Sequence, residues 1–306
     1  MTNLTVTIAV PTRNRAPALR QCLTKLTELE YSPFDILVVD NGSTDDTATV
    51  VRSFAADSPV PVRYLFESRR GLCHARNRAL AEAGADVVGF VDDDCYPQAD
   101  WLSRIMVEFA DERVGYVGGR LLLHDPTDAP YTVNTSTTRI VRPAGEWHSG
   151  DDLPGTGMAV RRRAFRATGG YDPLLGPGGP LLSGDDIDMH WRLWAAGWTG
   201  VYTPDAVTYH AHGRKPESDS LVNIKYDYAI ARGGWYAKRF LFGPRRFRTL
   251  YAWVIWERPR HSVGTLATQV RGLFRYLRLA LPRLARGGIS ALHPPIFPSP
   301  TSGSSS

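Results

Sequence analysis

Cysteine is scarce in this chain of 306 residues, which contains Cys22, Cys73 and Cys95 and no others. Their odd number, and the lack of Cys-x-x-Cys spacing or a His-rich partner stretch, argue against a disulfide framework and a structural zinc site. No run approaches the ~18 consecutive apolar residues of a membrane-spanning helix, and no signal-peptide pattern precedes the first strand-like segment. These absences predict a cytoplasmic protein in a reducing environment.

Acidic residues are nearly missing from residues 225–288, where 14 lysines and arginines stand against two acidic residues and give a charge of +12. Because the whole chain carries +5, residues 1–224 carry −7. This asymmetry indicates that the two parts meet different partners. The basic part suits anionic lipid, nucleic acid or a phosphorylated acceptor, and a plain basic surface is the alternative.

The basic stretch contains an apolar periodicity that predicts an amphipathic helix ending near Pro282. The apolar residues on one face of this helix are Leu266, Val270, Leu273, Leu277 and Leu281, with Arg271, Arg275 and Arg278 to one side. Nearby aromatic residues, including Trp253 and Trp256, are of the kind that favours a membrane interface. We therefore expect peripheral association with the inner face of the plasma membrane, with packing against the rest of the protein as the alternative.

The remaining composition, with 43% hydrophobic and 22% charged residues, is that of a globular protein with a sizeable core. Strand-like segments at residues 5–10, 36–39, 62–66 and 87–91 alternate with helical patterns. This βαβ rhythm predicts an α/β fold, a Rossmann-like, mostly parallel sheet with helices on both faces. Ligands then bind beyond the carboxyl ends of the strands.

Two acidic clusters stand at positions where ligands are expected. Asp92, Asp93 and Asp94 follow the buried strand at 87–91, and their mutual repulsion calls for a divalent cation or a set of hydrogen-bond donors. Carboxylate oxygens suit Mg²⁺ or Mn²⁺. Asp185 and Asp186 open a helix, where Asp186 can accept a proton from an attacking hydroxyl. The alternatives are a solvated acidic turn for the first cluster and helix capping for the second.

Five ordered motifs, at residues 6–15, 38–45, 70–77, 90–94 and 184–205, resemble those of family 2 glycosyltransferases. The resemblance covers roughly residues 4–212 and implies the GT-A fold, a nucleoside-diphosphate sugar donor and a divalent metal, Mn²⁺ or Mg²⁺. It implies a glycosyltransferase domain at 1–212, with a nucleotide-sugar-binding half at 1–120 and an acceptor and catalytic half at 121–212. Residues 213–290 then form a basic helical appendage, and residues 291–306 a disordered tail.

The resemblance also implies a role for each matching residue. Asp186 is the catalytic base of inverting members, with Asp185 orienting the acceptor, and Asp94 and His210 hold the metal. Asp92 lies near the ribose, and Asp93 is the variable middle residue of the Asp-x-Asp element, on the donor side. The other donor-binding residues implied are Pro11, Thr12, Asn14, Asp40, Arg70 and Arg76. Trp147, Trp191, Trp194 and Trp198 are candidates for an aromatic wall against a sugar, or for core.

The function expected from the resemblance is transfer of a sugar to an acceptor hydroxyl, with uridine favoured as the donor base. A lipid-linked acceptor, in lipid-linked glycan or cell-surface polysaccharide synthesis, would explain the basic appendage. A nucleotidyltransferase is one alternative, although residues 11–15 lack the glycines of a triphosphate-binding loop. A lipid-binding or nucleic-acid-binding module is another, but it leaves the acidic motifs unexplained, and nucleic acid is the partner least expected.

Overall fold

The computed structural model describes residues 4–145, 153–242 and 263–293. The tail expected at 294–306, Trp147, Trp253 and Trp256 lie outside the described residues. The strands are β1 (Val6–Thr12), β2 (Asp35–Asp40), β3 (Val62–Phe66), β4 (Val87–Phe90), β5 (Cys95–Pro97), β6 (Val114–Leu123), β7 (Ile140–Arg142), β8 (Met158–Arg161) and β9 (Thr199–His210). The α-helices are α1 (Ala16–Thr27), α2 (Thr47–Asp57), α3 (Leu72–Glu82), α4 (Trp101–Glu108), α5 (Phe165–Thr168), α6 (Asp185–Ala195), α7 (Asp219–Phe242) and α9 (Val263–Gly287). Short 3₁₀ turns are η1 (Arg162–Ala164) and η2 (Gly288–Ala291).

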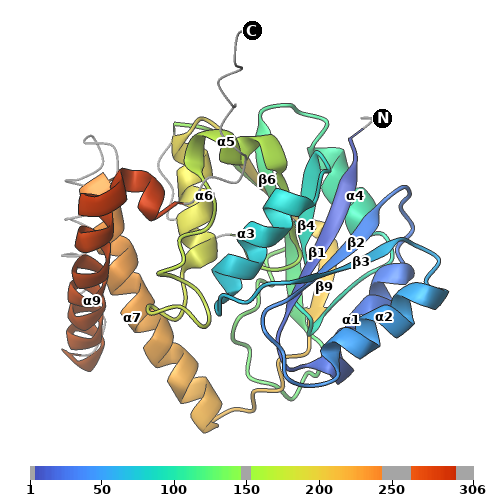
Figure 1. Cartoon of the computed structure of the whole chain (residues 1–306), viewed down its shortest axis with the longest axis horizontal. Coiled ribbons are helices and arrows are strands. Elements are labelled where there is room, and N and C mark those ends of the chain that lie inside the picture. Colours follow the sequence, from blue (N-terminus) through green and yellow to red (C-terminus); the bar gives the residue numbers. More distant parts are fainter. Residues whose placement is uncertain (1–3, 146–152, 243–262, 294–306) are drawn as a thin grey trace, which may run out of the picture.

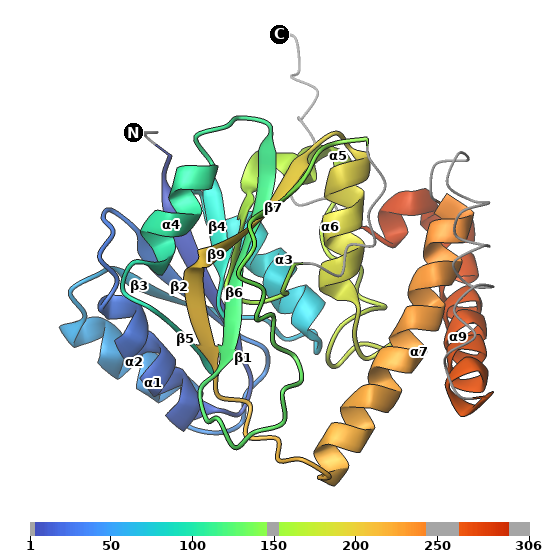
Figure 2. The ribbon, with the colours of Figure 1, turned by 180° about the vertical axis from the view of Figure 1, so that it is seen from behind.

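These strands form one sheet in the order β3-β2-β1-β4-β8-β6-β9-β5, with β7 paired to β9. The four strands β3, β2, β1 and β4 are parallel, as the βαβ rhythm predicts. Beyond them, β8 runs antiparallel to both β4 and β6, whereas β6 and β9 are parallel. The mostly parallel sheet is confirmed, with β5, β7 and β8 running against the common direction. Figures 1 and 2 show the sheet from its two sides.

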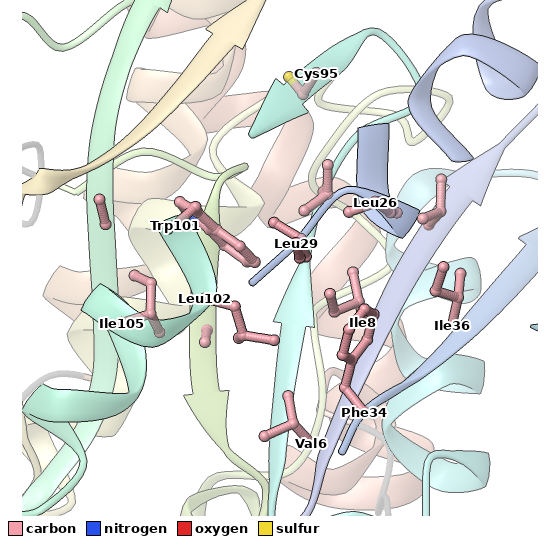
Figure 3. Packing of buried hydrophobic residues seen from close by; sticks show 14 of the residues in the cluster. Val6, Ile8, Leu26, Leu29, Phe34, Ile36, Cys95, Trp101, Leu102 and Ile105 are labelled. Carbon is pink, nitrogen blue, oxygen red and sulfur yellow. The ribbon is translucent and has the colours of Figure 1, made fainter. Parts of the chain in front are cut away.

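Helices cover both faces of the sheet because apolar side chains alternate to both sides of its buried strands. On one face, Leu26 of α1 packs in one cluster with Trp101 of α4 and with Ile8 and Ile36 from the strands, as Figure 3 shows. On the other face, α3, α5 and α6 pack on side chains of β2, β4 and β8. This layering holds the carboxyl ends of β1 and β4 in fixed positions, and these ends carry the acidic and nucleotide-type motifs.

The C-terminal helices α7 and α9 form a further layer against α6 (Figures 1 and 2). Tyr276 and Ala280 of α9 are buried with Ile230 of α7 and Leu181, which precedes α6. Leu292 is fully buried in the same cluster, although a disordered tail was expected from residue 291. The described helices of the basic region, α7 and α9, therefore pack on the rest of the fold, as in the alternative considered from the sequence. Helix α9 also continues through the exposed Pro282 to Gly287, beyond the expected stop.

A fully buried ionic cluster joins α7 to α6. The ammonium of Lys238 lies 2.8 Å from carboxylate oxygens of both Asp172 and Asp188, and Asp188 also accepts from Arg192 Nε at 2.9 Å. Two cations and two carboxylates thus balance in a site without solvent access. Breaking such a buried pair leaves an uncompensated charge and costs roughly 3–5 kcal/mol. The cluster fixes α7 against the helix that begins with Asp185 and Asp186.

Other expectations from the sequence concern cysteines and membrane spans. Cys22, Cys73 and Cys95 are buried free thiols, in agreement with the absence of a disulfide framework. No helix within the described ranges has the length and apolarity needed to cross a bilayer.

Trp191 and Trp194 are buried, and Trp198 packs beside the second core cluster. These three tryptophans therefore belong to the packing and do not line the cleft described below.

Candidate functional site

A cleft of about 1100 Å³ opens at the carboxyl ends of β1 and β4. Its walls come from segments far apart in the sequence, namely the ends of β1, β4 and β9, the starts of α3 and α6, the loop around Gly155, and α7. Single ligand pockets usually measure 300–1,000 Å³, so this cleft has room for more than one small ligand. All five acidic residues of the two predicted clusters line it.

Asp94 and His210 meet because β5 and β9 are antiparallel neighbours in which Cys95 faces His210. His210 Nε2 lies 3.5 Å from Asp94 Oδ1, and Arg15 Nη1 lies 3.0 Å from Asp94 Oδ2. Burial alone would raise the pKa of Asp94, but His210 and Arg15 hold it well below its usual range. Burial opposes the charge of His210, yet Asp94 raises its pKa overall.

The donor atoms around Asp94 fit a divalent cation. The Asp94 carboxylate, the His210 imidazole and the Cys95 thiol each offer one ligand atom, and these three atoms all lie within 4.8 Å of one another. Burial and the neighbouring carboxylates raise the pKa of Cys95 well above its usual value, so the thiol stays protonated and is a poor ligand. The oxygen and nitrogen donors that remain suit Mn²⁺ or Mg²⁺.

Asp92 and Asp93 lie beside this pair in different surroundings. Asp93 accepts a hydrogen bond of 2.7 Å from the Thr12 hydroxyl and lies 3.1 Å from Arg15 Nη1. Burial raises the pKa of Asp93 to about 7, against the opposing charge of Arg15. The Asp92 side chain is 30% exposed and lies 3.4 Å from Arg76. Asp92 is thus the member of the triplet most open to a ligand.

The amino-terminal motif residues form the other end of the cleft. Pro11, Thr12, Asn14 and Arg70 all line it. Asn14 has a positive φ of 54° and accepts a hydrogen bond of 2.7 Å from the Thr44 amide, which ties the loop after β1 to the loop after β2. Within the part of the chain that the structure describes, Arg70 has no hydrogen-bond or ion-pair partner.

Asp40 differs from its expected role as a direct ligand of the base. Its Oδ1 accepts from the Ser43 amide at 2.8 Å and its Oδ2 accepts from the Tyr64 hydroxyl at 2.8 Å. The side chain is buried and does not line the cleft, so it orders the loop after β2. The neighbouring Asn41, which no motif argument singled out, does line the cleft and accepts from the Gly71 amide at 2.8 Å.

Arg76 is a buried guanidinium at the centre of the cleft floor. It donates at 2.7 Å to Asp185 Oδ2 and at 2.7 Å to the carbonyl of Gly155. Its Cζ lies 5.7 Å from the ring centre of Phe90 and 5.4 Å from that of Tyr171. Asp185 therefore holds Arg76 in place. From the sequence, Asp185 was expected to orient the acceptor. Arg76 remains within reach of the donor side through Asp92.

Asp186 opens onto the same cleft from the first turn of α6, which Gly184 starts in a left-handed conformation with φ 84°. The N-cap position is Gly184, so no side chain caps this end of the helix. Gly155 lies directly against the Asp186 carboxylate, where a Cβ would come within 2.5 Å of Oδ2. Burial, and then the charge of Asp185, raise the pKa of Asp186 well above its usual range. Asp186 is thus an aspartate suited to receiving a proton.

Helix α7 supplies a wall of the cleft that the sequence did not predict. The α7 residues lining the cleft are Ser220, Asn223, Ile224, Asp227 and Tyr228. The Tyr228 ring lies 5.5 Å from that of Tyr131, which follows β6. No local motif marks these residues, because their approach to Asp186 depends on how α7 docks on α6. A stretch of Tyr, Asp and Asn after the last strand was the signal available.

Comparisons with known proteins agree with this geometry. The family model for glycosyl transferase family 2 matches residues 7–169. The pre-mycofactocin glycosyltransferase of Mycobacterium tuberculosis is 31% identical over 216 residues, which cover 68% of this chain and 43% of that relative. This chain thus spans less than half the length of that relative.

Two further comparisons cover more of the length of the protein that is compared with this chain. The N-acetylglucosaminyl-diphospho-decaprenol L-rhamnosyltransferase of the same organism is 28% identical over 282 residues, which cover 77% of this chain and 87% of that relative. Among solved structures, the mannosyltransferase PcManGT of Pyrobaculum calidifontis, in complex with GDP-Man and Mn²⁺, matches with a TM-score of 0.63 and 25% identity. That match covers 97% of this chain and 83% of that one.

Proposed function

We propose, on the premise that this chain belongs to glycosyl transferase family 2, that it transfers a glycosyl group from a nucleoside-diphosphate sugar to an acceptor hydroxyl with inversion at the anomeric carbon. The observation that carries the proposal is the position of Asp186, a carboxylate with raised pKa in the same cleft as the Asp92–Asp94 triplet. A general base and a metal-type site that share one cleft fit a single displacement.

The donor would lie along Pro11, Thr12, Asn14 and Arg70, with its ribose near Asp92. Asp94 and His210 would hold Mn²⁺ or Mg²⁺, which when bound neutralises charge on the diphosphate. The complex of PcManGT with GDP-Man and Mn²⁺ supports this donor class and this type of ion. It also makes guanosine a candidate base beside the uridine favoured from the sequence.

In the proposed reaction, the acceptor oxygen forms a bond to the anomeric carbon as the bond from that carbon to the diphosphate oxygen breaks. The nucleoside diphosphate leaves with the electron pair, and Asp186 receives the hydroxyl proton. Asp185 keeps Arg76 in position, and the fixed guanidinium stabilises negative charge at the floor of the cleft. A direct displacement of this kind inverts the anomeric centre.

The decisive test separates the base from the metal ligand. Asp186→Asn should lower kcat by roughly 10²–10⁴-fold, because it removes the proton acceptor, while Mn²⁺-dependent binding of the nucleoside diphosphate stays close to wild type. Asp94→Ala should weaken that binding itself. Both are measured by donor titration and by single-turnover transfer. A turnover of the Asn variant equal to wild type, with chemistry rate-limiting, would remove Asp186 from the mechanism.

We also propose that the acceptor is lipid-linked and that the protein works at the cytoplasmic face of an anionic membrane. Helix α9 exposes an apolar stripe of Leu266, Val270, Phe274 and Leu281, each 44–64% accessible. Exposed arginines 271, 275 and 278 border the stripe on one side. Leu273 and Leu277, expected on the same face, turn partly inward toward the α7 contact. The relative that acts on a decaprenol-linked substrate, by its name, supports such an acceptor.

Vesicle binding tests the membrane proposal. Each arginine near an anionic surface gains about 1 kcal/mol, so glutamate at 271, 275 and 278 should abolish binding to acidic vesicles at low salt, measured by co-sedimentation. Phe274→Ser should weaken it through the apolar contact. The matched control replaces three exposed arginines outside α9, namely Arg20 of α1, Arg104 of α4 and Arg113 before β6. Helices α1 and α4 lie on the side of the molecule away from α9 (Figure 1). An equal loss of vesicle binding in both triple variants would mean that binding depends on the protein's net charge and not on the arginines of α9.

A further inference from the structure

Arg214 is a cation of the cleft whose side chain has no ion-pair partner among the described residues. It follows β9 by four residues, lines the cleft, and its Nη1 is buried without a hydrogen bond. No carboxylate among residues 4–145, 153–242 and 263–293 forms an ion pair with it. A buried guanidinium nitrogen without an acceptor is costly, so a ligand that supplies anionic oxygens there gains binding free energy.

Neighbouring cations are already engaged. Arg15 bridges Asp93 and Asp94, and Arg76 is held by Asp185. Lys215, the residue after Arg214, lies 2.7 Å from both Asp125 and Asp128. Arg13 and Arg70 also line the cleft, but at the end formed by the loop after β1 and the start of α3, where the donor is proposed to lie.

The surroundings of Arg214 place it on the acceptor side. The Arg214 carbonyl accepts a hydrogen bond of 2.8 Å from the amide of Ala129, two residues before Tyr131, and Arg214 and Tyr228 both line the cleft. Tyr131 packs on Tyr228, and the ammonium of Lys225 lies 5.9 Å from the Tyr131 ring centre. Asp227 of α7 also lines the cleft, and its carboxylate would repel an anion bound beside Arg214.

We infer that Arg214, with the Tyr131–Tyr228 pair, forms an acceptor subsite for a phosphate ester, so that the acceptor hydroxyl belongs to a phosphorylated molecule. The guanidinium fork matches phosphate oxygens, and the two rings offer a flat apolar surface to a sugar or an alkyl chain. This inference rests on the proposed function, since it assigns the acceptor's charge. A prenyl phosphate and a soluble sugar phosphate share this chemistry.

Calorimetric titration tests the subsite, with Mg²⁺ and UDP present to fill the donor side. The probes are hexyl phosphate, glucose 1-phosphate and the neutral methyl glucoside. Wild-type protein should bind a phosphate probe at least tenfold more tightly than methyl glucoside. Arg214→Met should abolish this preference, and Arg214→Lys should retain part of it. Tighter binding of hexyl phosphate identifies a lipid source, and tighter binding of glucose 1-phosphate a soluble one.

Lys215→Met is the matched control, because it removes an adjacent cation that is already paired, and it should keep the full preference. Thermal unfolding checks that each variant folds. An equal preference in wild type and Arg214→Met, or no preference in wild type, overturns the inference. Since the titration needs no transfer, Arg214-dependent phosphate binding in a protein without transferase activity would sink the proposed function alone, and an active enzyme without it would sink this inference alone.

Discussion

Two neighbouring carboxylates in the first turn of α6 have opposite electrostatic surroundings. Asp185 is buried and bonded to the guanidinium of Arg76 at 2.7 Å. Asp186 opens onto the cleft, and its carboxylate accepts from the Ile187 amide, with no cation bonded to it among the described residues. Asp185 offsets the buried charge of Arg76, whereas Asp186 carries a negative charge that its surroundings disfavour. Their removal should therefore have opposite effects on stability.

Thermal unfolding at pH 8 should reveal this difference. Asp185→Asn leaves Arg76 without its closest counter-charge and should lower the free energy of unfolding by about 3 kcal/mol, the low end for a broken buried pair. Asp186→Asn should leave it unchanged or raise it. Because the folded pKa of Asp186 is raised, the stability linked to its protonation is present below the unfolded pKa and is lost as pH rises through the folded one.

The same contrast is checked by repeating the unfolding at pH 4.5. There, Asp186 of the wild type is protonated in the fold, so any advantage of Asp186→Asn should shrink. If Asp185→Asn were as stable as wild type at both pH values, Arg76 would be compensated by Asp92 and the Gly155 carbonyl alone.

The sequence predicts which residues meet in the cleft better than it predicts which groups they bond to. The Asp92–Asp94 triplet, Asp186 and His210 sit at strand and helix ends whose positions follow from the βαβ rhythm, so their convergence in one cleft could be expected. The partner of each charge could not, because it depends on side-chain placement across the sheet. Asp185 was thus assigned to the acceptor, and Asp40 to the donor base, although both serve neighbouring protein groups.

Among the elements, helices α7 and α9 approach so closely that glycine is required at their crossing. A Cβ on Gly233 would lie 1.8 Å from the Gln269 carbonyl oxygen, and one on Gly272 would lie 1.9 Å from that of Ile230. Neither obstacle is a side chain that could rotate away. The crossing therefore fixes how closely α9 packs on α7, which no helical periodicity in the sequence could reveal.

Gly272→Ala should push the two helices apart. Overpacking of this kind costs about 1–3 kcal/mol, which corresponds to a fall in Tm of several degrees. Gly287→Ala is the control, because its Cβ would approach the Ala291 side chain no closer than 3.2 Å. Differential scanning calorimetry distinguishes the two, and equal Tm values would mean that the crossing relaxes without cost.

At the scale of the whole molecule, the last described residues are attached to the middle of the chain. His293 is buried against Gly169, next to the Lys238 cluster. Burial, and then the charges of Lys238 and Arg192, lower its pKa well below the usual value, so the ring is neutral in the fold. The basic region thus depends on an uncharged histidine for its attachment.

Acidification should weaken this attachment. Since the unfolded state takes up the proton near pH 6.5 and the fold does not, the stability from His293 is present above about pH 6.5 and is lost as pH falls below it. Tm should therefore drop between pH 7.5 and 5.5, and His293→Phe should remove part of that dependence. The same replacement at the exposed His124 should leave it as in wild type; an identical slope in all three proteins would contradict the assignment.

The buried cluster around Lys238 has a consequence for the order of events during translation. Asp172, Asp188 and Arg192 leave the ribosome before Lys238, so the nascent chain at first carries two carboxylates of the cluster with only one of their two cations. Until Lys238 emerges, the cluster lacks one positive charge, and its contact between α7 and α6 cannot form. The end of the cleft built by β1, β4 and α3 can therefore form before the α7 wall is fixed against α6.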